Sequence, residues 1–182
     1  MSENRMSVAY YQRNMKCVYF VDEKWRHIPA VEFPGGLTFT FTSGNKVICD
    51  ETFFKKSLNS EPLANRQFIV LRNTETDSSA KKKNKPVSCS NVTYVSNIYE
   101  ALDMAGTDET WVIGSPSFVS KMSKYCAICL THVMHSRGKR QKDYGLGTLH
   151  LGKSWDKLAF SSSAACNGRR IERMEFYNTD CH

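Results

Sequence analysis

The sequence predicts a single α/β domain with a mostly parallel central sheet, an antiparallel C-terminal edge and flanking helices. Apolar runs of strand length alternate with helical patterns through the middle of the chain, an order that is typical of parallel sheets. Near the end, Cys166–Arg169 predicts a turn, and Arg170–Tyr177 alternates in a way that indicates a terminal edge strand. At 182 residues, 41 % of them hydrophobic, the chain is long enough to bury a core without disulfides or metals.

Short apolar runs predict the strands that come before this hairpin. They are rich in β-branched and aromatic residues, which suit a buried pleated surface, and most are too short for a typical helix. The runs are Lys16–Val21, Lys46–Cys49, Arg66–Leu71, Val92–Val95, Trp111–Ile113 and the longer Tyr125–Met134. Leu37–Thr42 alternates apolar with polar residues and predicts a half-exposed strand.

Three segments predict helices between these strands. Asp50–Ser57 predicts a short helix, and Asn97–Ala105 predicts a longer one that begins at Ser96 or Asn97. The third follows Gly114, with Ser115 as the N-cap and Pro116 as the first helical residue. A strand that ends at a glycine and turns directly into a helix aims free backbone N–H groups at one point, and phosphates are often bound at such a point.

Composition sets the expected boundaries and compartment. We expect a polar leader over residues 1–14, one domain over 15–178 with basic loops at about 73–90 (mobile) and 136–147, and a tail over 179–182. No run of 18 apolar residues occurs, so no membrane segment is expected. The seven cysteines are odd in number and scattered, which favours free thiols and an intracellular location, cytoplasmic or nuclear.

Four short matches follow one another in a consistent order along the chain. They are Lys16–Val21, Val47–Phe54, Pro62–Leu71, and Tyr99–Leu102 followed by Thr110–Gly114. Over roughly residues 15–178 they resemble the dihydrofolate reductase family: its first strand, its Val-Ile-Met-Gly-basic-x-Thr-Trp and Pro-Leu-x-x-Arg-x-Asn-x-Val-Leu segments, and its Glu-Ala-Leu helix and Val-Ile-Gly-Gly turn. The resemblance implies that fold, and it raises the expectation of an NADPH-dependent dihydrofolate reductase.

The resemblance also implies roles for particular residues. Thr52, Gly114 and Ser115 would contact the cofactor. Glu32 would be the catalytic acid, with a solvated loop glutamate as the alternative interpretation. Arg66 would grip the carboxylate of the folate tail through a bidentate pair, and its alternative is an arginine that merely flanks a strand.

Several residues depart from the family pattern on both sides of the expected site. Asp50 and Glu51 stand where the family has glycine and a basic residue, and two carboxylates facing a phosphate would repel it. Ser115 replaces the second glycine of the Gly-Gly pair, and Pro34–Gly36 ends any helix that could carry Glu32. We therefore expect a catalytically inactive scaffold that binds protein or nucleic acid, with neither NADPH nor a folate-like ligand; the divergent NADPH-dependent reductase is the alternative.

A net charge of +7 favours anionic partners. The residues expected to contact nucleic acid or another partner are Arg137, Lys139, Arg140 and Lys142. A second basic run occupies Lys81–Lys85. The alternative for both is a solvated basic loop.

Cys126, Cys129, His132 and His135 raise the question of a zinc site. On one continuous strand, residues three apart point to opposite faces of the sheet, so neither pair would meet at one ion. Buried strand cysteines are the favoured interpretation, and no metal is expected.

Overall fold

The computed structural model describes residues 15–32, 46–58, 66–73, 91–135, 142–155, 157–166 and 169–179. Its strands are β1 Met15–Asp22, β2 Lys46–Asp50, β3 Gln67–Leu71, β4 Val92–Val95, β5 Thr110–Val112, β6 Ile128–His135, β7 Lys157–Cys166 and β8 Arg169–Tyr177. Its helices are α3 Glu51–Phe53, which continues as the π-helical segment η2 Phe54–Leu58, then α5 Ile98–Ala105 and α6 Pro116–Ser123. Two 3-10 turns, η1 Ala30–Glu32 and η4 Lys153–Trp155, complete the described elements.

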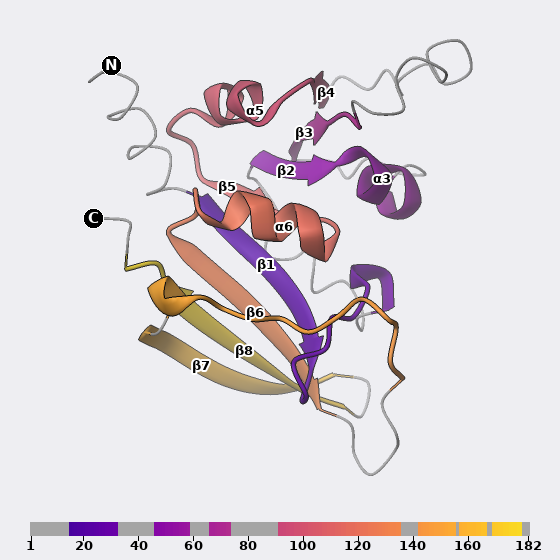
Figure 1. The fold of residues 1–182 in the computed structure, drawn as a ribbon, viewed down its shortest axis with the longest axis vertical. Coiled ribbons are helices and arrows are strands. Elements are labelled where there is room, and N and C mark those ends of the chain that lie inside the picture. The colour runs from indigo at the N-terminus through magenta and orange to yellow at the C-terminus, as the bar shows by residue number, and fades with distance from the viewer. Residues whose placement is uncertain are drawn as a thin grey trace.

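The strands form one sheet in the order β4-β3-β2-β5-β1-β6-β8-β7 (Figure 1). The five neighbouring pairs from β4 along the sheet to β6 are parallel. The β6–β8 and β8–β7 pairs are antiparallel. This confirms the predicted α/β class with an antiparallel C-terminal edge. The prediction that Arg170–Tyr177 is the edge strand is wrong, because β8 lies between β6 and β7 and the hairpin places β7 outermost.

Both faces of the sheet are covered, which explains why its strands read as nearly continuous apolar runs. One buried cluster combines side chains from β1, β5 and β6 with apolar residues of α5 and α6. A second cluster on the other face includes Phe20, Phe54, Phe68 and Trp111. In Figure 1, α6 crosses in front of β1, and the carboxyl ends of β2 and β5 lead into α3 and α6.

Local signals fix the start and the end of α5. The side chain of Asn97 accepts the Glu100 N–H at 3.0 Å, and the Glu100 carboxylate accepts the Ser96 N–H at 2.9 Å. The first bond satisfies an N–H group that the first helical turn leaves open, and the second ties the residue before the N-cap to the same turn. Gly106, at φ 57°, ends the helix and donates its N–H to the Leu102 carbonyl.

The predicted strand Tyr125–Met134 begins later than expected, at Ile128. Cys126 therefore precedes β6, and it lies in the same buried cluster as Cys129 and Cys17. The prediction that Cys126 and Cys129 point to opposite faces is wrong, because it assumed that both residues belong to one regular strand. Within the described ranges, no group of three or more His, Cys, Asp or Glu side chains is placed to hold a metal ion.

Several expectations fall outside the described residues: the leader 1–14, the strand 37–42, residues 74–90 of the first basic loop, residues 136–141 of the second, and residues 180–182 of the tail. Among the residues that are described, no helix is long and apolar enough to cross a membrane.

Candidate functional site

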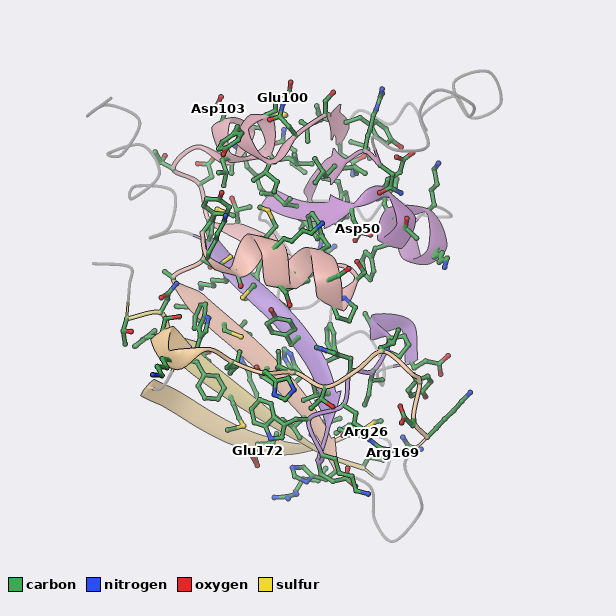
Figure 2. All side chains as sticks on the ribbon, viewed as in Figure 1. Arg26, Asp50, Glu100, Asp103, Arg169 and Glu172 are labelled. Atoms are coloured by element: carbon green, nitrogen blue, oxygen red, sulfur yellow. The ribbon has the colours of Figure 1, made fainter. Side chains whose placement is uncertain are left out.

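The site is built around the turn from β5 into α6. Gly114 adopts φ 150°, a backbone region that favours glycine, and Ser115 and Pro116 then start the helix. β2 runs parallel to β5 with Ile48 opposite Val112, so Asp50, two residues further along, lies beside Gly114. Figure 2 places Asp50 between α3 and the start of α6.

The Asp50 carboxylate is bound by groups from both helix starts. Its Oδ1 accepts the Ser115 N–H at 3.2 Å, and its Oδ2 accepts the Ser115 hydroxyl at 3.4 Å and the Phe53 N–H at 3.4 Å. Asp50 is only 8 % exposed, and an added Cβ on Gly114 would collide with its Oδ1. The turn that the sequence identifies as a phosphate-binding point therefore holds a carboxylate of the chain itself.

The Glu51 carboxylate has other partners and does not bind the groups of the β5–α6 turn. Its carboxylate pairs with Lys55 at 2.9 Å and accepts the Asn73 N–H at 3.1 Å, while the Thr52 hydroxyl oxygen accepts the Asn73 side-chain amide at 2.9 Å. Burial acts to raise the pKa of Glu51, but Lys55, the Asn73 N–H and Arg72 outweigh it, and the pKa lies below its usual value. Of the two carboxylates expected to face a phosphate, only Asp50 lies in the turn.

A cavity of about 220 Å³ opens next to this turn. Its lining comes from β1, the chain just after β1, α3, η2, the β5–α6 turn and α6. Thr52, Gly114 and Ser115 all line it, so the structure brings the three residues predicted to bind cofactor to one place. Most of the other lining residues are apolar or aromatic: Val18, Tyr19, Phe20, Ile28, Pro29, Ala30, Phe53, Pro116 and Val119.

The chain after β1 folds back to form one wall of this cavity. The buried Asp22 accepts the Lys24 and Arg26 N–H groups and pairs with the Arg26 side chain at 2.7 Å, which fixes a tight turn. Trp25 takes a left-handed conformation there, at φ 63°. His27 then bridges back to Val21 in antiparallel fashion, and the Ile28 N–H donates to the Phe20 carbonyl at 2.8 Å. This part of the β1 backbone is thus paired with the chain's own following segment.

Two titratable groups of the cavity wall, His27 and Tyr19, have pKa values shifted in the direction that favours their neutral forms. Burial and the nearby His150 lower the pKa of His27, and burial raises the pKa of the Tyr19 hydroxyl, which bonds the Ser120 hydroxyl at 3.3 Å. Lys56 is the one lysine or arginine on the described lining, and no Asp or Glu belongs to it. A carboxylic acid that could protonate a bound ring is not among these wall residues.

The two other predicted ligand-binding residues, Glu32 and Arg66, are not among the described residues that line the cavity. Glu32 ends η1, donates its N–H to the Pro29 carbonyl at 2.9 Å, and is exposed. Arg66 precedes β3, where its carbonyl accepts the Asn91 side-chain amide at 3.2 Å, and burial lowers its pKa. Neither residue is among the described lining residues, and their roles in acid catalysis and tail binding stay predictions.

Of the predicted partner-contact residues, Arg137, Lys139 and Arg140 lie outside the described residues, and Lys142 is exposed with its ammonium 5.2 Å from the Tyr144 ring centroid. Sequence reasoning missed three features of the site: the bonds that hold the Asp50 carboxylate on Ser115 and Phe53, and the presence of His27 and of Lys56 on the cavity wall. An Asp directly before a helix is an N-cap signal and could have revealed the first. The other two depend on contacts between distant segments.

Comparisons with known proteins match the architecture described above. No family model and no curated protein matches the sequence. Among solved structures, a dihydrofolate reductase from Enterococcus faecalis, complexed with NADP(H) and RAB-propyl, superposes with a TM-score of 0.65. The match covers 93 % of this chain and 98 % of that one at 17 % sequence identity, a level at which the fold alone is shared. The chain therefore has the dihydrofolate reductase fold in a strongly divergent sequence.

Proposed function

We propose that this protein is a catalytically inactive member of the dihydrofolate reductase fold that acts as a binding scaffold for protein or nucleic acid. The observation that carries the proposal is the Asp50 carboxylate in the β5–α6 turn, bound by the Ser115 N–H and hydroxyl and by the Phe53 N–H. These are the donors that a cofactor phosphate would need at this point.

A phosphate brought to the turn would have to displace the Asp50 carboxylate or bind beside its negative charge. Two unit charges about 4 Å apart repel by about 4 kcal/mol at an effective dielectric constant near 20. Displacement would also leave the carboxylate to find new partners in a site where it is 8 % exposed. Either route opposes binding of a dinucleotide in the manner that the fold suggests.

The cavity supports the same conclusion. Its volume of about 220 Å³ is below the roughly 300–1,000 Å³ of ordinary ligand pockets, and a reductase must hold a pterin and a nicotinamide together. Its described wall also offers no carboxylic acid to a bound ring. Space and proton supply both count against hydride transfer to dihydrofolate.

The alternative is a divergent NADPH-dependent reductase. Two observations favour it: Thr52, Gly114 and Ser115 meet at one cavity, and the similar structure was solved with NADP(H). Under this alternative, Asp50 rotates away when the cofactor arrives. Following NADPH absorbance with dihydrofolate as substrate tests it, and turnover that the Asp50→Ala variant increases would establish the alternative.

The partner surface that we propose is the basic end of the antiparallel strands. Arg170 pairs with His135 across β8 and β6, so the β7–β8 turn and the chain leaving β6 emerge at the same end of the sheet. Lys142, Arg169 and Arg170 are exposed there, and Figure 2 shows Arg169 and Arg26 at this end. The sequence between His135 and Lys142 adds Arg137, Lys139 and Arg140.

Charge neutralisation tests this surface. Replacing Arg137, Lys139, Arg140 and Lys142 by glutamine should abolish a salt-dependent mobility shift with RNA or DNA, because phosphate contacts dominate such binding. A matched control replaces four exposed lysines elsewhere by glutamine: Lys55, Lys121, Lys124 and Lys153. An equal loss in both variants would indicate non-specific attraction by net charge. An unchanged shift in the first would show that these four residues do not contact the nucleic acid, and the absence of any shift in the unmodified chain would leave a protein partner as the scaffold's ligand.

A further inference from the structure

The wall of the cavity contains one unusual feature, the side chain of Lys56. This lysine lines the cavity and is exposed, so its ammonium lies toward the mouth rather than the depth. Among the described residues it takes part in no ion pair or hydrogen bond, whereas the adjacent Lys55 pairs with Glu51 at 2.9 Å. A cation beside an apolar hollow attracts an anion that brings apolar surface with it.

A second donor lies on the same wall. Thr52 is four residues before Lys56 in the continuous α3–η2 segment, a spacing that places both residues on one side of a helical turn, and both line the cavity. The Thr52 hydroxyl oxygen already accepts the Asn73 amide, which leaves its own hydrogen free to donate. Two donors on one helical face suit the two oxygens of a carboxylate.

The other wall residues indicate the polarity and the size of the part of the ligand that lies inside the cavity. Phe20, Phe53, Ile28 and Val119 are apolar, and burial together with His150 keeps the pKa of His27 low, so the interior carries no charge near neutral pH. An apolar cavity of about 150 Å³ holds one benzene ring, so about 220 Å³ accommodates one ring with a substituent.

We propose that this cavity is a binding site for a small monocyclic aromatic carboxylate, with the ring among the apolar wall residues and the carboxylate at the mouth on Lys56 and Thr52. The site uses none of the donors that Asp50 occupies. It rests on the proposed function in one respect: a dinucleotide must not already fill the cavity.

The test titrates the full chain with benzoate and with benzamide, its uncharged counterpart of the same shape, by calorimetry or amide chemical shifts. We expect saturable benzoate binding about two- to fivefold tighter than that of benzamide, the range for an exposed ionic contact. Lys56→Gln should remove this preference, and Lys55→Gln, the neighbouring lysine that does not line the cavity, should keep it. Ala30→Phe, which adds a ring at the wall, should weaken both probes.

Three results would overturn the inference: no saturable benzoate binding up to about 10 mM, equal affinity for benzamide, or equal effects of the Lys55 and Lys56 substitutions. Because both lysines are exposed, neither variant threatens folding. The proposed function fails by a different result, NADPH turnover, so the failure of one is distinguishable from that of the other.

Discussion

Replacing Asp50 by alanine tests whether the carboxylate holds the site together or merely faces it. The substitution removes the N-cap of α3, which typically costs about 1 kcal/mol, and it leaves the Ser115 N–H and hydroxyl without their acceptor. Uncompensated groups of this kind cost about 1–3 kcal/mol, and the slight exposure of the site lets water relieve part of it. We expect a loss of about 2–3 kcal/mol in the free energy of unfolding, which corresponds to a fall of about 5–10 °C in the Tm of a chain this size.

Urea and thermal unfolding of four variants separate the contributions. Asp50→Asn keeps an acceptor oxygen and a good N-cap, so it should lose less than half as much as Asp50→Ala. Glu51→Gln removes the neighbouring carboxylate, whose Lys55 pair is partly exposed, and should cost under about 1 kcal/mol. Lys55→Gln provides the partner control for that pair. If Asp50→Ala were as stable as the wild type, or more so, the idea that this carboxylate satisfies the turn would be wrong.

Three further outcomes follow from the same structure. Gly114→Ala should destabilise by more than about 2 kcal/mol in equilibrium unfolding, because φ 150° strains an L residue and the new Cβ meets the Asp50 carboxylate; a near-neutral effect would contradict the described turn. Burial and then Arg173 lower the pKa of His132 to about 4, so the unfolded chain binds more protons and stability falls as pH drops from 6.5 toward 4. Between pH 7 and 5 this amounts to about 2 kcal/mol, and a His132→Phe variant, compared by urea unfolding at both pH values, should lose that part of the slope. Four buried thiols should resist iodoacetamide in the native protein and react on unfolding: Cys17, Cys49, Cys126 and Cys129. Peptide mapping would show which thiols are labelled, and prompt labelling of any of the four in the native protein would refute its burial.

Much of the fold could be predicted because its signals are local. The predicted strands over residues 16–21, 46–49, 66–71 and 92–95 correspond to β1–β4 within a residue or two, since parallel strands buried on both faces read as short apolar runs. Asn97 and Pro116 marked helix starts by side-chain capping and by a missing N–H. These signals require no knowledge of distant segments.

The predictions that were wrong, and the features that sequence reasoning missed, depend on contacts between distant segments. Whether Asp50 faces a ligand or Ser115 is decided by a contact across 65 positions of sequence, and its N-cap signal describes only the local half. The facing of Cys126 and Cys129 depended on where β6 begins, which no residue at Tyr125–Ala127 marks clearly. The edge position of β7 follows from how the C-terminal hairpin docks on β6, and the alternation of Arg170–Tyr177 suits an inner strand as well.

The presence of Lys56 and His27 on one cavity wall illustrates the same limit. Each residue is unremarkable in its own segment, and only the fold-back after β1 and the parallel pairing of β2 with β5 bring their segments together. Thr52, Gly114 and Ser115 could be predicted to meet because a family resemblance supplied the topology. The resemblance also brought Asp50 to this place, but it could not show that Ser115 and Phe53 bind its carboxylate there.

The most direct test of the central claim is a thermal melt of the full chain with and without millimolar NADPH. We predict no change in Tm, because the donors at the β5–α6 turn are already bound to Asp50. A ligand present at 100 times its Kd would stabilise the folded chain by about 2.7 kcal/mol and raise the Tm by several degrees. Such a rise would contradict the account, since the cofactor would then bind despite the carboxylate in its place.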